Sequence, residues 1–455
     1  MVPGFCYNNR SLPRLDEGWR RVVPTRMAMN QEKSGPRFFY GWVIVTASMA
    51  VIAVSVGLTQ SFGIFFKPLL AEFGWNRAQT SAAYSIGFLT QGVFAMGAGA
   101  LSDRYGPKKV LAVSGLIFAL GNILMFKVHT LGQLYLVYGL INGLGRSGLF
   151  SPVVATVTRW FTEKRGLALG IMLSGGGVGT ALLPLASQYL VTAYGWRMAF
   201  VWVGLISGVV IVVAAQFMKH GPREAGLVPY GEAAPDEDAK GGSVVGDAAS
   251  GIPLREAMVS RALWLVLLAS ALGGLAIQMT FVHLAAHATD VGLSAAVAAS
   301  LFTVVGISNV IGKLSMGIYS DRYGRKAALV IGFGLGAVVM LWLIPARVPW
   351  LFYAFAAGFG FTYAGRLVQF PALMGELFGL GSLGALAGVL SLSSTLGSST
   401  GAYLGGYVFD VTESYDLAFL IAAAGLFVAL VSVLLVRAPR WREYPVSGGD
   451  FGQAL

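Results

Sequence analysis

Apolar stretches long enough to cross a lipid bilayer recur along this chain. A helix that spans the hydrocarbon core needs about 20 mostly apolar residues, at a rise of about 1.5 Å per residue. The chain is 56% hydrophobic and 12% charged, with a mean hydropathy of +0.69, which excludes an ordinary soluble domain. Twelve such runs occur, at 39–68, 78–102, 108–127, 131–158, 164–190, 196–219, 262–288, 293–319, 325–345, 349–377, 383–409 and 415–438. The sequence therefore predicts an all-α membrane protein with twelve transmembrane helices.

Lysine and arginine are unevenly distributed over the loops between these runs. With a cytoplasmic N-terminus, 24 of the 32 basic residues fall in inside loops and tails, 5 in outside loops and 3 within spans. This bias predicts orientation, because basic loops stay on the cytoplasmic side. We expect a multi-pass protein of the cell inner (plasma) membrane with both termini cytoplasmic. The net charge of +11 reflects this sidedness. It does not indicate nucleic-acid binding, since no readout motif accompanies it.

A loop motif occurs twice at equivalent places. Gly-x-x-x-Asp-Arg-x-Gly-x-Lys ends the second run at Gly99–Lys108 and the eighth run at Gly317–Lys326. Asp103 and Asp321 are 218 residues apart, and the other motif residues keep this offset. The repeat predicts two pseudo-symmetric halves of six helices each.

Five regions follow from the runs and the repeat. They are an N-terminal cytoplasmic tail (1–38), a six-helix half (39–219), a cytoplasmic linker (220–261), a second six-helix half (262–438) and a C-terminal cytoplasmic tail (439–455). The N-terminal tail and the linker segment 231–250 are predicted to be disordered, since the linker segment almost lacks large apolar residues. The single cysteine, Cys6, cannot form an internal disulfide.

Three basic residues fall well inside predicted spans. They are Arg146, Lys313 and Arg366, whereas the middle of the spans holds no Asp or Glu. A cation in hydrocarbon costs at least ~2.5–3.5 kcal/mol and marks a functional site by default. We expect these cations to line a wet cavity and bind an anion. Structural alternatives remain open: Lys313 is near enough to the cytoplasmic end to snorkel, and each arginine can bond helix carbonyls.

Several uncharged polar residues accompany these cations. Asn309 lies one helical turn before Lys313, so both share a face, while Asn142 and Tyr138 precede Arg146. His283 and His287 share a face of the seventh run and are candidate proton sites, although we favour the interpretation that they are hydrogen-bonded structural histidines. No third metal ligand accompanies them, so we predict no metal site.

The duplicated loop within twelve spans resembles the major facilitator superfamily. This resemblance implies two halves that rock around a cavity near the bilayer midplane. It also implies that Asp103, Arg104, Asp321 and Arg322 act as a conformational latch, in which carboxylates meet helix N-termini of the other half. Topology and loop folding alone would also account for the motif.

A narrower resemblance is to the monocarboxylate transporter-like family, including bacterial oxalate/formate exchanger-like members. Arg159–Gly170 and Phe39-Tyr40-Gly41-Trp42 resemble the two signatures of that family, although the second lacks its leading acidic residue. That family places an acidic or amide residue four positions before a substrate-binding arginine, and Asn309 with Lys313 is similar. Lysine keeps the charge but loses the bidentate grip of arginine on a carboxylate.

These features predict a secondary transporter of small organic anions, mono- or dicarboxylates, by proton symport or anion exchange. The expected substrate-binding residues are Lys313, Asn309, Arg146, Arg366, Asn142 and Tyr138. The expected partners are a small carboxylate, protons or a counter-anion, and the lipid bilayer. We expect no enzyme activity, no cofactor, no ATP and no nucleic acid. An exporter of drugs or other metabolites with the same fold, and a non-transporting membrane sensor, are the alternatives.

Overall fold

A computed structural model describes residues 39–225, 227–230, 254–379 and 383–437 of the 455-residue chain. The predictions made for the N-terminal tail up to residue 38, for Cys6, for linker residues 231–250 and for the C-terminal tail lie outside the described residues.

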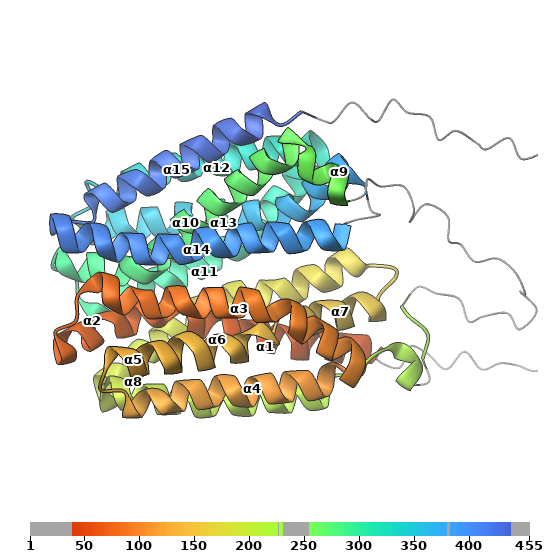
Figure 1. Ribbon diagram of the computed structural model, residues 1–455, viewed down its shortest axis with the longest axis horizontal. Helices are drawn as coiled ribbons and strands as arrows, with labels where there is room; N and C mark the ends of the chain where they lie inside the picture. The colour runs from red at the N-terminus through yellow and green to blue at the C-terminus, as the bar shows by residue number, and fades with distance from the viewer. Residues whose placement is uncertain (1–38, 226, 231–253, 380–382, 438–455) are drawn as a thin grey trace, which may run out of the picture. The chain divides into compact units, whose positions relative to one another are not determined.

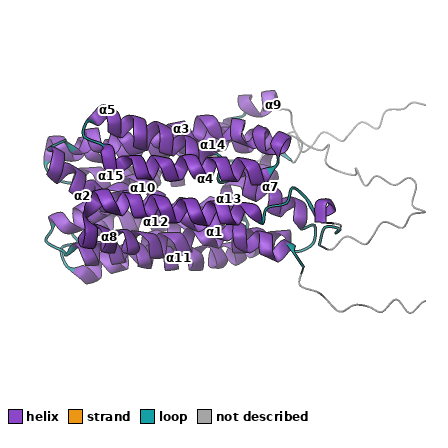
Figure 2. Cartoon of the chain, turned by 90° about the horizontal axis from the view of Figure 1, so that it is seen from below, coloured by secondary structure: helices purple, strands orange, loops and turns teal. Residues whose placement is uncertain are grey.

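Helical segments cover all twelve predicted runs (Figures 1 and 2). The N-terminal half consists of α1 (Gly41–Gln60), α2 (Phe62–Phe73), α3 (Arg77–Tyr105), α4 (Pro107–Leu124), η1 (Met125–Lys127), α5 (Leu131–Leu134), η2 (Tyr135–Ile141), α6 (Asn142–Ser147), α7 (Ser151–Trp160) and α8 (Arg165–Gln216). After η3 (Pro222–Ala225) and α9 (Leu254–Val259), the C-terminal half consists of α10 (Arg261–Asp290), α11 (Ala295–Tyr323), α12 (Arg325–Leu343), α13 (Pro349–Phe378), α14 (Leu383–Thr412) and α15 (Asp416–Leu435).

Length and composition mark most of the long helices as candidate membrane spans. Among the described residues, eight helices are long and apolar enough to cross a membrane. One of them, α8, has 52 residues and is interrupted at Gly195, where φ 75° and ψ 161° are not helical. It therefore contains the fifth and the sixth predicted spans. The chain is an all-α membrane protein, as the apolar runs predicted.

The duplicated loop has the same backbone conformation in both copies. Gly106 ends α3 with φ 86° and ψ 153°, and Gly324 ends α11 with φ 92° and ψ 153°. Each glycine donates its N–H to a serine carbonyl four residues earlier, at 2.9 Å and 2.8 Å. This conformation favours glycine because a Cβ atom clashes at positive φ. Glycine at these two motif positions therefore has a local structural cause.

The fourth predicted span is not one continuous helix. It begins as α5, passes through the π-helical η2 and α6, and breaks between Ser147 and Ser151 before α7. Pro152 lies in the first turn of α7, where its missing N–H costs no hydrogen bond. In contrast, α13 accommodates Pro371 within a continuous helix.

Glycines allow very close helix contacts within each half. A Cβ atom at Gly57 of α1 would lie 2.5 Å from the carbonyl oxygen of Gly179 of α8. In the C-terminal half, a Cβ atom at Gly274 of α10 would lie 2.6 Å from the carbonyl oxygen of Ser394 of α14. The glycine run of the fifth span is therefore a packing surface, as expected for small residues between membrane helices.

Two antiparallel helix pairs join the halves. In the first pair, Thr303 of α11 donates to the carbonyl oxygen of Ala181 of α8 at 2.7 Å. In the second, Ser85 of α3 donates to the carbonyl oxygen of Ser399 of α14 at 2.6 Å. Figure 1 shows α3 beside α14 where the red-to-yellow and blue parts of the chain meet. These pairs, α8–α11 and α3–α14, form the main part of the interface between the halves, and α2 also contacts α10.

The two segments that carry the narrower family resemblance pack against each other. The rings of Tyr40 and Trp160 have centroids 5.6 Å apart, and those of Trp42 and Phe161 are 5.0 Å apart. Trp160 is fully buried and donates its indole N–H to the carbonyl oxygen of Lys219. Residues separated by about 120 positions in the sequence thus form one aromatic contact at the end of the bundle predicted to be cytoplasmic.

The contact at Gly179 yields a stability prediction. Gly179→Ala would place a methyl group against the carbonyl of Ala53, so we expect destabilisation by about 1–3 kcal/mol. Gly170→Ala, on the same helix but with no atom within 4 Å of its Cβ position, is the matched control and should be neutral or slightly stabilising. Thermal unfolding in detergent measures both, and equal melting temperatures would contradict the proposed contact.

Candidate functional site

Arg146 lies inside the N-terminal half, next to the interface between the halves. Its side chain is 2% exposed, and its Nη1 donates to the hydroxyl oxygen of Thr59 at 3.2 Å. The guanidinium carbon lies 5.2 Å from the ring centroid of Phe88, a cation–π distance. Within the described part of the chain, its Nε and Nη2 have no hydrogen-bond partner. This buried cation therefore keeps free donors, which suits an incoming anion.

A polar network next to Arg146 crosses from one half to the other. The hydroxyl of Tyr84 lies 3.1 Å from Oε1 of Gln60 in its own half and 2.9 Å from Oε1 of Gln278 on α10. Gln60 follows Thr59, the partner of Arg146, in the chain. Tyr138 is 3% exposed, and its ring is tilted against that of Phe62, with ring centroids 4.6 Å apart. The structure thus brings Tyr138 and Arg146 to one aromatic and polar cluster.

Lys313 and Asn309 lie on the α8–α11 interface. Nζ of Lys313 donates to the carbonyl oxygen of Leu173 at 2.9 Å, across the two halves. Asn309 is fully buried, and a Cβ atom at Gly177 would lie 3.2 Å from its Oδ1. Both side chains therefore lie on the face of α11 that meets α8; the spacing of four predicted a shared face but not its partner helix. An ammonium group has three donors, so Lys313 has two left beyond this bond.

Arg366 packs inside the C-terminal half. It is 2% exposed and packs against α12, with its guanidinium carbon 4.9 Å from the ring centroid of Phe333. A Cβ atom at Gly336 would lie 3.4 Å from its Nη1. Its Nε and Nη1 lack partners among the residues that the structure describes. Arg366 therefore faces a helix wall within the C-terminal half, and its binding role stays a prediction.

Asn142 also faces a helix rather than the interface. Its Cβ would lie 3.2 Å from a Cβ atom built at Gly121 of α4, and the asparagine is 2% exposed. Its Nδ2 has no partner in the described ranges. Asn142 therefore differs from Arg146 one turn later, which reaches α1 and α3.

The two histidines of α10 differ in their surroundings. His283 is fully buried, with Nε2 2.9 Å from the carbonyl oxygen of Ala402 and Nδ1 3.1 Å from the hydroxyl of Tyr415. A carbonyl only accepts, so we assign the proton to Nε2, and Nδ1 then accepts from Tyr415. His287 lies among aromatic rings, and its Nε2 is buried without a partner in the part of the structure described. Of the pair, His287 has the nitrogen that remains available.

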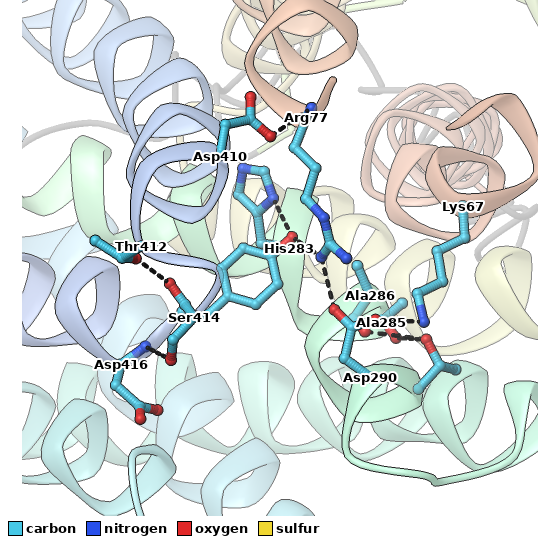
Figure 3. Close-up of polar contacts among 12 residues, drawn as sticks. Lys67, Arg77, His283, Ala285, Ala286, Asp290, Asp410, Thr412, Ser414 and Asp416 are labelled. Atoms are coloured by element: carbon cyan, nitrogen blue, oxygen red, sulfur yellow. Dashed lines mark hydrogen bonds and ion pairs between the residues drawn. The ribbon is translucent and has the colours of Figure 1, made fainter. Parts of the chain in front are cut away.

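A charged cluster that sequence reasoning missed joins the halves at the end predicted to face outside (Figure 3). Asp290 of α10 accepts from Nζ of Lys67 and from Nη1 of Arg77, each at 2.6 Å. Asp410 of α14 accepts the backbone N–H groups of Arg77 and Ala78 at 2.9 Å and 2.7 Å. The guanidinium carbon of Arg77 also lies 3.4 Å from the ring centroid of Phe409. The sequence contained one signal for this cluster: residues of opposite charge lie at the outer ends of spans that belong to opposite halves.

The residues of the predicted latch make contacts within their own halves. Asp103 pairs with Arg159 at 2.6 Å, and Asp321 pairs with Arg325 at 2.7 Å. The guanidinium carbons of Arg104 and Arg322 lie over the rings of their neighbours Tyr105 and Tyr323, respectively. Among the described residues, every ion pair that joins the halves is at the opposite end of the bundle. A latch between the halves thus stays a prediction for another conformation.

Two cavities lie near the predicted outer end. One, of about 380 Å³, is lined by residues of α3, η2 and α14, including Gln79, Tyr403 and Asp410. The other, of about 110 Å³, includes Lys67 and Thr289. Neither is lined by any of the six predicted substrate-binding residues. In this conformation those residues are packed against protein.

The packing of Arg366 predicts that its charge is not needed for stability. Arg366→Met removes a buried guanidinium with unpartnered nitrogen atoms, and with it the desolvation cost of a charge that no ion pair offsets among the described residues. We expect an unchanged or higher melting temperature in detergent. Arg77→Met, which removes an ion-paired guanidinium, should lower it. A clear fall for Arg366→Met would show that the guanidinium has a stabilising partner.

A family model described as Major Facilitator Superfamily matches residues 47–315 and 266–454. Monocarboxylate transporter 13 of Bos taurus is 29% identical over 404 residues, covering 88% of this chain and 90% of the relative. Monocarboxylate transporter 11 of Homo sapiens is 28% identical over 431 residues, covering 92% and 88%. An uncharacterized MFS-type transporter of Escherichia coli, YhjX, is 27% identical over 365 residues, covering 78% and 85%. The two resemblances read from the sequence are thereby confirmed.

Solved structures agree on the fold. A mutant of the nucleoside transporter NupG has a TM-score of 0.67 at 15% identity, covering 87% of this chain and 99% of that one. A bacterial homologue of the human lysosomal transporter Spinster has a TM-score of 0.65 at 15% identity, covering 88% and 95%. At this level of identity the likeness establishes the fold alone.

Proposed function

We propose that this chain, which belongs to the Major Facilitator Superfamily and is a secondary transporter, carries small organic anions such as mono- or dicarboxylates. The observation that carries the proposal is Arg146: a cation 2% exposed, beside the interface of the halves, with two of its nitrogen atoms unpartnered among the described residues. The two relatives with the name monocarboxylate transporter support the same cargo class.

Energetics favour an anionic cargo at this place. A cation in hydrocarbon costs at least ~2.5–3.5 kcal/mol, and a buried donor without a partner costs about 1–3 kcal/mol more. A carboxylate would satisfy the free nitrogen atoms of Arg146 with charge-assisted hydrogen bonds. A neutral or cationic cargo would leave the cost uncompensated. An anion therefore gains more from this site than other cargo of the same size.

The two halves offer different groups to such an anion. Arg146 belongs to the N-terminal half, while Lys313 and Asn309 belong to the C-terminal half. Nζ of Lys313 donates one hydrogen bond to the carbonyl oxygen of Leu173 and has two donors left for a carboxylate. Cargo bound by groups from both halves would couple its passage to their relative movement, as alternating access requires. Tyr138 would add an aromatic wall beside Arg146.

The membrane orientation and the coupling are part of this proposal. We place the chain in the plasma membrane with both termini cytoplasmic, because the short loops on that side are rich in lysine and arginine. The ion cluster around Asp290 then closes the outer side. Transport proceeds by proton symport or by anion exchange, with His287 as the titratable group for symport.

The role of Lys313 yields the central functional prediction. Lys313→Ala should abolish carboxylate uptake by proteoliposomes, because it removes the positive charge of the C-terminal half. Lys313→Arg keeps the charge and should retain uptake. Lys109→Ala, which removes an exposed lysine, is the matched control and should transport like the parent protein. Full uptake by Lys313→Ala would refute the role.

Proton coupling through His287 predicts a loss of pH dependence. His287→Gln removes the titratable ring whose Nε2 is unpartnered in the described structure. If His287 carries the proton, an acidic outer pH should no longer stimulate uptake by this variant. His283→Gln should keep the stimulation, because both nitrogen atoms of His283 are already bonded. Equal pH profiles for His287→Gln and the parent protein would favour anion exchange.

A further inference from the structure

Lys67 and Arg77 are held together on one rigid hairpin of the N-terminal half. Lys67 lies in the middle of α2 and Arg77 begins α3, with a three-residue turn between the helices. Gly74 ends α2 in the left-handed conformation at φ 66°, and Asn76 caps α3 with a complete capping box. The rings of Phe73 and Trp75 stack 4.2 Å apart over this turn. The two cations therefore move as a pair.

Glu72, the carboxylate on the same hairpin, is bonded to other residues. Glu72 accepts from the indole N–H of Trp196 at 2.6 Å and from Nη2 of Arg197 at 2.7 Å. Among the described residues, the carboxylate paired with both Lys67 and Arg77 is that of Asp290, from the opposite half. Asp410 bonds the backbone N–H groups of the α3 N-terminus rather than the guanidinium.

Each oxygen of Asp290 is bonded to one cation. Oδ1 accepts from Lys67 and Oδ2 from Arg77, both at 2.6 Å, as Figure 3 shows. The side chains are 37%, 14% and 26% exposed for Lys67, Arg77 and Asp290, so water reaches the cluster. The hairpin thus forms a two-cation site whose occupant in this conformation is a carboxylate of the chain itself.

We propose that Lys67 and Arg77 form an entry site for the carboxylate of the cargo at the outer mouth, and that Asp290 occupies this site when the mouth is closed. The inference rests on the proposed function. When the halves part at this end, Arg77 loses Asp290, Tyr415 and Phe409 together, because all three belong to the C-terminal half. The hairpin then presents two unpaired cations, while Asp290 leaves with the other half. An anion arriving from outside takes the place of Asp290.

In this exchange, the cargo competes with the carboxylate of Asp290 for the two cations. Cargo bound to the hairpin prevents Asp290 from returning until the anion moves inward. The paired cations also attract anions over about one Debye length, roughly 8 Å at physiological salt. Uptake at low cargo concentration therefore depends on salt in the outer medium.

Variants that remove either a cation or the carboxylate of the cluster distinguish an entry site from a contact that only closes the mouth. Uptake from outside is measured in intact cells with radiolabelled lactate, pyruvate and oxalate. Lys67→Gln should raise the outer KM about tenfold, the size of a charge-assisted hydrogen bond. Asp290→Asn should lower the outer KM, because the internal competitor is gone. If the cluster only closes the mouth, both variants loosen it and both shift KM in the same direction, which overturns the proposal.

Three controls complete the experiment. Asp410→Asn also removes a contact between the halves but leaves Asp290 on the cations, so its KM should fall less than that of Asp290→Asn. Lys67→Arg should restore the KM of the parent protein and its dependence on salt. Inside-out vesicles should give the same inner KM for Lys67→Gln and the parent protein, and an equal rise on both sides would contradict an outer site. Size-exclusion profiles confirm that each variant folds.

The outcomes also separate this inference from the function on which it rests. A parent protein that takes up none of the three carboxylates overturns the proposed function, and the entry site falls with it. A parent protein that transports a carboxylate, with an outer KM unchanged in Lys67→Gln, overturns the entry site alone.

Discussion

The close approach of helix backbones at glycine is the contact on which the rest of this structure depends. Apolar side chains gain little from meeting each other in lipid, so membrane helices associate through dispersion contacts and polar bonds at short range. At Gly57 against Gly179, and at Gly274 against Ser394, a single methyl group would collide with a carbonyl. The equivalent helix pairs of the two halves, α1–α8 and α10–α14, both pack closely at glycine in this way.

Short distances between helices then determine where polar side chains find partners. At the α8–α11 interface, Lys313 and Thr303 reach backbone carbonyls of the other half because Gly177 and Gly306 allow the helices to touch. Arg146 lies against Gly87 in the same way. The outer cluster of Lys67, Arg77 and Asp290 differs, because it joins helix ends through charge. The interface thus combines contacts within the membrane with an ionic closure at one end.

The sequence predicted what depends on local pattern. Run length and hydropathy located the spans, and the repeated loop predicted the equivalent turns at Gly106 and Gly324, which adopt one conformation. The spacing of Asn309 and Lys313 predicted their common face. The rotation of α13 was not predictable, because a helix with apolar residues on all sides gives no periodic signal, and Arg366 turned toward α12. The outer cluster was missed because its members are distant in sequence and each resembles an ordinary loop charge.

The hydroxyl of Tyr84 has a further consequence. It lies within hydrogen-bond distance of Gln60 in its own half and of Gln278 in the other, yet a phenol has only one proton to donate. Whichever amide it releases, the remaining one keeps this fully buried oxygen satisfied. Separation of the halves at this level would therefore break one of these contacts but would not leave the buried hydroxyl of Tyr84 without a hydrogen-bond partner. A second hydrogen-bond acceptor for Tyr84 therefore lowers the free-energy barrier to separating the halves, a step that a transporter repeats in both directions.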